Sequence, residues 1–277
     1  MPRILMMEGN TLKAQRMAAE LGVMSASMVY TKAIRAHFPN IHIDVINAAD
    51  QGQSLPAGTV MSDFDGLVIS GSGLHAYDQR FEVTNQIDLL KQFSETGKPI
   101  LGSCWGLQIA VIAGGGSVEK SPNGREVGFA RKVWLTSAGK THPYFKNKPQ
   151  VFDAPCIHYD EVSALPTGSA ILCSNSHSDI QGAVIPLGKS EVWAVQYHPE
   201  FDLEQLLGLY KLYAKDMVQQ GFFTDKEVAN QYSSDLDQLA KNREDKSLRW
   251  RLGIDDDILA DTIRRAEIIN WIESLPK

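Results

Sequence analysis

The chain has 277 residues, of which 43% are hydrophobic, and a formal net charge of −6. It can therefore bury a full core in one large domain or in one domain with an appendage. The absence of a Lys/Arg-rich run in the sequence argues against a nucleic-acid partner. The apolar stretch of MPRILMMEGN is too short for a signal peptide or a membrane span. Three cysteines without metal-ligand spacing predict a reduced, cytoplasmic protein with no membrane partner and no metal.

The first 116 residues alternate between predicted strands and predicted helices. Strands are expected at residues 3–9, 41–50, 64–73 and 99–104. Helices are expected at 14–38 (interrupted near Gly22), 85–98 and 105–116. This alternation predicts an α/β fold, in which a mostly parallel central sheet is flanked by helices.

The following residues predict further strands, some of them antiparallel, and then a return to helix. The strands are expected at 125–136, 150–162, 169–176, 182–187 and 191–201. A helix is expected from Asp202 to Gln220. We assign residues 1–221 to a catalytic domain.

Residues 222–277 are charged and carry helical patterns without strand signals. Helices are expected at 226–241 and 255–275, and Asp255–Asp257 favour a helix N-terminus. One apolar face at helical spacing is formed by Leu259, Ile263, Ala266, Ile269 and Ile272. We predict a C-terminal helical extension that contributes stability or assembly and takes no part in the chemistry.

Cys104 lies in G-S-C-W-G, directly after a buried strand and directly before a helix. This is the spacing of a nucleophile elbow, G-x-S-x-G, with cysteine in place of serine. The helix beginning at Trp105 places its positive end beside the sulfur, which favours the thiolate. The alternative interpretation is a small buried cysteine in a tight turn.

His198 and Glu200 are the candidate base and its orienting carboxylate. His198 stands in AVQYHPEF at the end of an apolar run, and Pro199 stops the strand there. In an extended chain, side chains two residues apart point the same way, so Glu200 can hold the His198 tautomer. The alternative is a structural histidine at a strand end.

GSCWGLQ and AVQYHPEF together resemble the class I glutamine amidotransferase family, whose pattern is G-x-C-x-G-x-Q and, further along, Q-x-H-P-E. An α/β-hydrolase places its acid between nucleophile and histidine, whereas here the acid follows the histidine. The resemblance covers roughly residues 3 to 220. It implies a flavodoxin-like fold similar to a stand-alone amidotransferase domain of the GMP synthase type, with Cys104, His198 and Glu200 as the triad.

The resemblance also implies the remaining site residues. DFDGLVISGSG resembles the family's oxyanion loop, which assigns Gly71 and Ser72 to the oxyanion hole, together with the backbone N–H of Trp105. REVGF and IHYDEV resemble family segments that lie along bound glutamine. The implied substrate-binding residues are Gln108, Gly128, Phe129, His158 and Tyr159. Val127 replaces a family tyrosine and Tyr159 a family glycine, which predicts a more apolar wall.

The implied reaction is attack of Cys104 on a γ-glutamyl amide, release of an amine or ammonia, and hydrolysis of a γ-glutamyl thioester. No cofactor is expected, and the sequence has no G-x-x-x-x-G-K-[ST] loop for ATP. The substrate is a small γ-glutamyl molecule. Three hypotheses about the function remain. The protein is a stand-alone γ-glutamyl amide hydrolase, a glutaminase subunit that supplies ammonia to a separate synthetase partner, or a catalytically idle binding module. A homo-oligomer is also compatible with the sequence.

Overall fold

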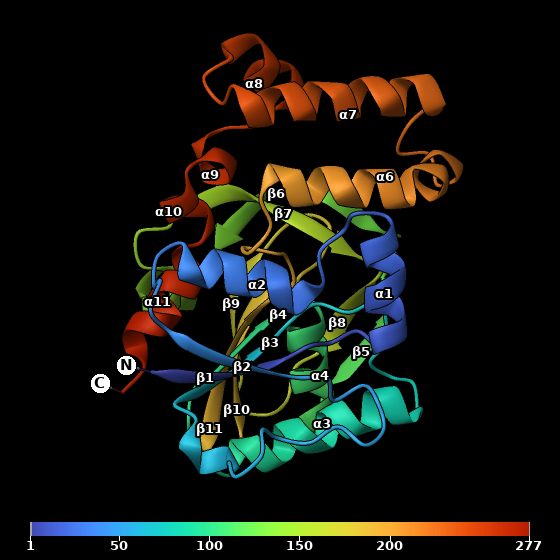
Figure 1. The fold of residues 1–277 in the computed structure, drawn as a ribbon. Coiled ribbons are helices and arrows are strands. Elements are labelled where there is room, and N and C mark those ends of the chain that lie inside the picture. The colour runs from blue at the N-terminus through green and yellow to red at the C-terminus, as the bar shows by residue number, and fades with distance from the viewer. Residues whose placement is uncertain (1, 277) are drawn as a thin grey trace.

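The computed structural model describes residues 2–276, and a nine-stranded mixed sheet lies at its centre (Figure 1). The strand order is β2-β1-β3-β4-β11-β10-β9-β6-β7. The parallel half consists of β2 (His42–Ile46), β1 (Arg3–Met7), β3 (Gly66–Ile69), β4 (Ile100–Ser103) and β11 (Ser190–Val195). The antiparallel half adds β10 (Gly182–Leu187), β9 (Ala170–Ser174), β6 (Glu126–Leu135) and β7 (Val151–His158). A separate pair is formed by β5 (Ser117–Lys120) and β8 (Asp160–Ala164).

Helices cover both faces of the sheet, and the alternation of side chains along β1 shows why. Leu5 and Met7 belong to one core with α3 (Phe81–Ser94) and α4 (Trp105–Ala113). Ile4 and Met6 belong to the opposite core with α2 (Ala26–Arg35) and α11 (Ala266–Ser274). Successive strand residues point to opposite faces, so the continuous apolar run of β1 is buried on both sides. The predicted α/β fold class is confirmed.

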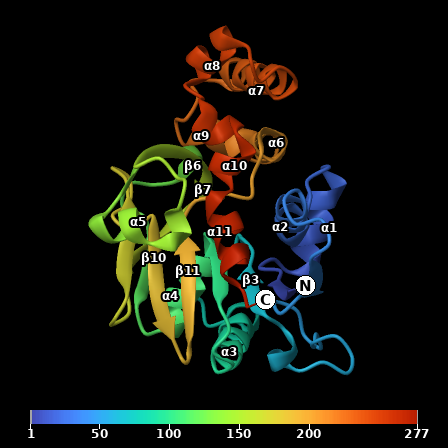
Figure 2. The ribbon, with the colours of Figure 1, turned by 90° about the vertical axis from the view of Figure 1, so that its left-hand side faces the viewer.

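A third core lies beyond the edge of the sheet where the parallel strands end. It is built by α6 (Leu203–Gln219), α7 (Lys226–Lys241) and α8 (Lys246–Leu252). Figure 2 shows α7 and α8 outermost, with α6 between them and the rest of the molecule. The remaining elements are α1 (Leu12–Glu20), η1 (Met61–Asp63), α5 (Ser137–Thr141), η2 (Pro143–Phe145), α9 (Asp256–Leu259) and α10 (Asp261–Arg264).

The single helix expected at 255–275 is wrong. Ala260 has an extended backbone (φ −81°, ψ 113°), so the segment divides into α9, α10 and α11. The Asp261 carboxylate then accepts hydrogen bonds from both Arg264 (2.6 Å) and Arg265 (3.0 Å). The expected apolar face is only partly buried. Its buried members are Leu259, Ala266 and Ile272, whereas Ile263 and Ile269 are half-buried.

The C-terminal helix α11 completes the main core. Trp271 is fully buried, and a Cβ atom on Gly66 of β3 would lie 2.7 Å from its ring. Residues 222–276 therefore divide between the sheet core and the third core, and the domain boundary at 221/222 stays a prediction.

Two local expectations also differ from the structure. The strand expected at 150–162 divides at Tyr159, because β7 joins the main sheet and β8 pairs with β5. The strand expected at 191–201 ends at Val195. Within residues 2–276, no helix combines the length and apolar composition needed to cross a lipid bilayer.

Candidate active site

The carboxyl ends of four parallel strands meet at one cavity of about 840 Å³. There β1 leads into Glu8–Asn10, β3 into Ser70–Gly73, β4 into Cys104, and β11 into the segment that carries His198. Ligands of open α/β sheets bind at this edge. The topology thus brings together residues nearly two hundred positions apart in the sequence.

Cys104 occupies a strained turn between β4 and α4. Its backbone has φ 49° and ψ −96°, a conformation that costs a non-glycine residue about 1–3 kcal/mol. Its N–H donates to Val195 O (2.8 Å), and its carbonyl accepts from Gln108 N (3.1 Å). A Cβ atom on Gly102 would lie 2.7 Å from the carbonyl carbon of Gly106, so the two elbow glycines allow α4 to approach β4. The geometry is that of the expected elbow.

His198 and Glu200 contact each other through a turn and not through an extended strand. Phe201 N donates to His198 O (3.2 Å), which closes the turn around Pro199 and Glu200. His198 Nδ1 lies 2.7 Å from Glu200 Oε1. The same oxygen accepts from the Ser103 hydroxyl at 3.0 Å. The predicted pairing is therefore present, although the local backbone expected for it is wrong.

The surroundings of His198 favour its charged form. Burial alone would lower the pKa of His198, but the Glu200 carboxylate and the neighbouring Cys104 sulfur outweigh it and raise the pKa to about 10. The ring stacks on Phe201, with centroids 4.0 Å apart. Nε2 is buried and has no hydrogen-bond partner among residues 2–276, and Cys104 and His198 line the same cavity. Nε2 is therefore free to exchange a proton with a bound molecule.

Gly71 and Ser72 lie in a loop that Asn10 and Glu8 hold in place. Asn10 donates to Gly71 O (3.2 Å) and accepts from Gly73 N (3.1 Å) and Ser72 Oγ (3.4 Å). The fully buried Glu8 carboxylate accepts from Asn10 N (3.0 Å) and from Ser27 N (2.7 Å). Sequence reasoning missed this support. Its signal is a carboxylate and an amide directly after the apolar run of β1.

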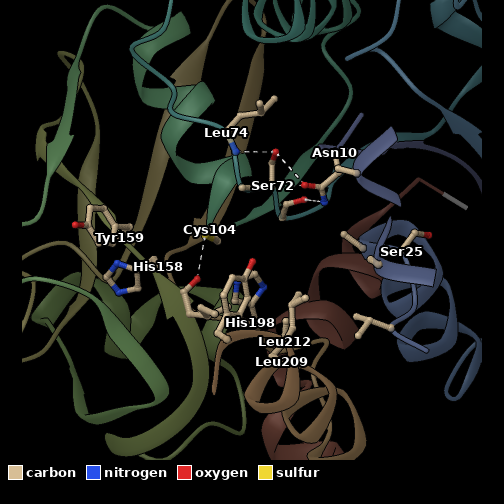
Figure 3. A pocket seen from close by; sticks show the side chains of 18 of the residues that line it. Asn10, Ser25, Ser72, Leu74, Cys104, His158, Tyr159, His198, Leu209 and Leu212 are labelled. Atoms are coloured by element: carbon tan, nitrogen blue, oxygen red, sulfur yellow. Dashed lines mark hydrogen bonds between the residues drawn. The ribbon is translucent and has the colours of Figure 1, made fainter. Parts of the chain in front are cut away.

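Of the residues expected to form the oxyanion hole, Gly71 and Ser72 line the cavity and Trp105 does not. Ser72 lines the cavity, and Leu74 N donates to its hydroxyl (3.2 Å) (Figure 3). Trp105 is the first residue of α4, and the first N–H groups of a helix have no acceptor within it. The Trp105 side chain points into the core and donates to Gln86 Oε1 (2.8 Å). Only the Trp105 backbone is therefore available for the expected role.

The structure brings some of the expected substrate-binding residues to the cavity and not others. Gln108, His158 and Tyr159 line it, and Gln108 Nε2 donates to Asp160 O (3.1 Å). Gly128 and Phe129 do not line it. Gly128 has φ +86° and packs against Tyr210, where a Cβ atom would lie 2.1 Å from the hydroxyl. Phe129 is buried in the third core, and the Arg131 guanidinium lies over its ring at 4.7 Å.

Arg125 was expected only as part of a segment, yet its side chain reaches the cavity. The guanidinium lies over the rings of Tyr159 (5.4 Å) and Tyr213 (5.2 Å), and its Nη1 is buried without a partner in the described chain. Nearby, the buried Asp160 carboxylate accepts from Tyr77 (3.3 Å) and lies 2.6 Å from His75 Nδ1. The cavity thus carries one cation without a carboxylate partner and one buried anion.

Glu126, His158 and His177 form a group that the sequence spacing did not reveal. Their nitrogen and oxygen atoms lie within 4.8 Å of one another, close enough for a metal ion. Hydrogen bonds already use the Glu126 oxygens, which contact His158 Nε2 (2.7 Å), Asn175 Nδ2 (2.6 Å) and Gln181 Nε2 (2.7 Å). The other His158 nitrogen faces Asp160 O at 3.0 Å. We interpret the group as a hydrogen-bond network that fixes His158.

Fold and site define a cysteine-dependent α/β enzyme with a Cys–His–Glu arrangement at the carboxyl edge of its sheet. The sequence matches the glutamine amidotransferase class-I family over residues 26–207. The chain therefore belongs to this family, and the resemblance inferred from its motifs is confirmed. It is an amide hydrolase, an enzyme that acts on C–N bonds.

Individual relatives and solved structures extend this assignment. Gamma-glutamyl-L-1-hydroxyisopropylamide hydrolase from Pseudomonas sp is 32% identical, over 99% of this chain and 92% of that protein. Gamma-glutamyl peptidase 5 from Arabidopsis thaliana is 26% identical over 64% of this chain and 70% of that protein. GMP synthase [glutamine-hydrolyzing] from Phocaeicola vulgatus is 30% identical over 55% of this chain and 28% of that protein. The structure of a glutamine amidotransferase from Thermotoga maritima shares the fold, with a TM-score of 0.69, 19% identity and 99% coverage of both chains.

Proposed function

We propose that this enzyme hydrolyses the amide bond of small γ-glutamyl amides, with Cys104, His198 and Glu200 as its catalytic triad. The observation that carries the proposal is the cavity itself, which contains Cys104 in a strained elbow beside a Glu200-paired His198. Two relatives named for γ-glutamyl hydrolysis, one aligned over nearly the whole chain, support the substrate class. The complete triad argues against an idle binding module.

The reaction proceeds in two displacement steps. His198 in its charged form already holds at Nε2 the proton of the Cys104 thiol. The Cys104 sulfur bonds to the γ-carbonyl carbon, and the C–N bond breaks as His198 gives this proton to the leaving nitrogen. A water molecule then gives a proton to the neutral His198 and attacks the thioester carbonyl, the C–S bond breaks, and glutamate leaves with Cys104 again paired with protonated His198. Glu200 holds the imidazole through Nδ1, and Ser103 in turn holds Glu200.

The oxyanion that forms in both steps needs fixed N–H donors. We assign this role to the backbone amides of Ser72 and Trp105, with Gly71 supplying the close approach to His198. Asn10 fixes the loop from outside the reaction centre, so it is a positioning residue. Preorganised donors stabilise a developing charge because they need no reorganisation during the reaction.

The glutamyl end of the substrate carries an α-carboxylate and an α-ammonium group. Arg125 offers an unpaired cation for the carboxylate, and Asp160 offers an anion for the ammonium. Tyr159 contributes its ring to the same wall, and Gln108 braces it through the Asp160 carbonyl. An α-glutamyl amide would place these two charges differently relative to the scissile bond.

Further assignments concern the domains, the cellular compartment and the partners of this enzyme. We assign residues 1–221 to the catalytic domain and residues 222–277 to a helical extension that stabilises it. The three cysteines are unpaired, which suits a reducing compartment such as the cytoplasm.

The GMP synthase relative supports a second candidate, a glutaminase that supplies ammonia to a separate synthetase. Assembly into a homo-oligomer stays a prediction.

One experiment tests the activity. Purified enzyme is assayed with glutamine, with one γ-glutamyl alkylamide and with the matching α-glutamyl alkylamide, and the enzyme is examined by mass spectrometry for a glutamyl adduct on Cys104. We expect turnover of the γ-linked alkylamide alone of the isomeric pair, together with the adduct. Equal kcat/KM for the α- and γ-linked amides contradicts the proposal. Restriction to glutamine, with activation by a partner, favours the ammonia donor.

A further inference from the structure

We infer that an apolar groove between α1 and α6 binds the amine half of the substrate, and that this half is an uncharged aliphatic group larger than ammonia. The inference rests on the proposed γ-glutamyl amide hydrolysis. The α1–α6 groove is the part of the cavity lined by Ala14, Met17, Ala18, Leu21, Leu209, Leu212 and Tyr213.

Two helices present apolar side chains to this groove at helical spacing. On α1 and its C-terminal end they stand at positions 14, 17, 18 and 21, and on α6 at positions 209, 212 and 213. Residues three, four and seven apart share one face of a helix. One face of each helix therefore lines the groove, and the two faces belong to one continuous cavity with Cys104.

The reaction chemistry directs the leaving amine into the groove. The leaving nitrogen must reach His198 Nε2 to accept its proton. His198 stacks on Phe201, two residues before α6 begins, so its ring borders the α6 side of the cavity. In Figure 3, His158 and Tyr159 lie on one side of Cys104, and Leu209 and Leu212 lie with His198 on the other. The glutamyl and amine halves thus have separate walls.

Size and charge define the class of amine. The cavity measures about 840 Å³, whereas a water-sized molecule such as ammonia needs only about 30 Å³. Among the described lining residues, the charged side chains other than histidines are Glu20, Arg125 and Asp160. Arg125 and Asp160 serve the glutamyl half, so the groove keeps Glu20 and no cation for a carboxylate on the amine. Glu20 is exposed, so solvent screens its charge, and the apolar side chains of the groove favour an uncharged alkyl substituent.

In this arrangement the exposed apolar face of α1 contacts the amine half of the substrate. None of the nine residues of α1, all of them described, is buried, and Met17 and Leu21 are 58% and 64% exposed. Polar contacts hold the helix, including Leu12 N to Asp50 Oδ2 (2.8 Å) and Gln15 Nε2 to Asn47 Oδ1 (2.8 Å). An alkyl group in the groove covers this face, and a methionine adapts its shape to different chains.

The test is a series of γ-glutamyl n-alkylamides from methyl to butyl, assayed with the wild-type enzyme and with a Met17→Gln/Leu21→Gln double variant. We expect wild-type kcat/KM to rise by up to about fourfold per methylene group, as for transfer of CH₂ from water. The double variant is expected to flatten this slope. Met28→Gln is the matched control, because Met28 is also 58% exposed but lies outside the cavity lining.

Each outcome decides the inference. A wild-type slope that both the control and the double variant preserve overturns it, as does a wild-type rate that does not change with chain length. Turnover of glutamine alone overturns it as well and points to the ammonia donor. No turnover of any γ-glutamyl compound, with no adduct on Cys104, removes the proposed function itself and the inference with it.

Discussion

Gly71 lies directly against the imidazole ring of His198. A Cβ atom at position 71 would come within 2.8 Å of His198 Cε1, closer than real Cβ contacts allow. The loop cannot retreat freely, because Asn10 binds the Gly71 carbonyl. The position of His198 and the conformation of the Gly71–Ser72 loop are therefore coupled by the absence of a Cβ atom at position 71.

Gly71→Ala is expected to lower kcat by about 10²-fold, because displacement of a catalytic group by about 1 Å costs on this order. The measurement is steady-state kinetics together with thermal unfolding, which shows that the fold persists. Gly73→Ala is the matched control, since a Cβ atom there meets no heavy atom within 4 Å. Equal losses in both variants would show that the His198 contact is unimportant.

Cys104 is expected to be the dominant reactive thiol. Cys156 and Cys173 are fully buried, and burial raises the pKa of both thiols, so they remain protonated and shielded. Limiting alkylation near neutral pH followed by peptide mapping measures this directly. Cys104→Ala should abolish turnover without loss of the fold. Preferential labelling of Cys156 or Cys173 would refute the assignment.

His198→Asn is expected to lower kcat by about 10³- to 10⁴-fold, because it removes the group that moves the proton. Glu200→Gln should cost less, because Phe201 packing retains part of the ring orientation. Kinetics of the two variants under saturating substrate compare the losses. If Glu200→Gln has no effect, Glu200 is not part of the triad.

The free energy of unfolding should fall as the pH rises through the alkaline range. The pKa of His198 is about 10 in the folded protein, against about 6.5 in an unfolded chain. Its stabilising contribution is therefore complete below pH 6.5 and is lost as the pH rises from 6.5 through 10. The limiting slope is about 1.4 kcal/mol per pH unit.

Urea unfolding of the wild type and of His198→Asn at several pH values between 6.5 and 10 measures this contribution. The difference between the two proteins should shrink as the pH rises. Parallel curves would mean that His198 does not titrate in this range. In Glu200→Gln the loss of the neighbouring charge should lower the His198 pKa, which NMR of the imidazole can follow.

Trp271→Ala is expected to destabilise the protein by about 3–5 kcal/mol, because it empties a fully buried site against Gly66 of β3. Trp250→Ala is the matched control, since Trp250 is 86% exposed and should change stability by less than about 0.5 kcal/mol. Chemical denaturation of both variants gives the comparison. Similar stability of the two would mean that α11 is not part of the core.

The parts of the site that could be predicted from sequence are those carried by short local motifs. The elbow around Cys104 needs only the glycines at 102 and 106, and the motif order placed His198 and Glu200. The turn at 198–201 could not be predicted, because an apolar run before a proline also suits a strand. Phe129 was misplaced because side chains alternate between the two faces of β6, and those of Val127 and Phe129 belong to the third core.

The contacts that hold the site in place could not be predicted from the sequence for a different reason. Glu8 and Asn10 act on a loop about sixty residues away, and no local pattern connects them. The same holds for Arg125 and Tyr213, which meet only because α6 crosses the end of the sheet. The interruption of the C-terminal helix at Ala260 could not be predicted either, because the apolar residues keep helical spacing across it, and the Arg264 side chain bonds back to Ile258 O only in the folded chain.

The burial of α11 affects how the chain folds during its synthesis. Lys148 and Glu267 pair at 2.8 Å in the core, and Glu267 also accepts from Tyr197, the neighbour of His198. In a nascent chain still lacking α11, α2 alone covers part of the apolar face of β1 and β3, and Lys148 has no counter-charge from Glu267. The core on this face is therefore complete only once residues 266–274 have been synthesised, and we expect a chain truncated before them to expose apolar surface that chaperones and proteases recognise.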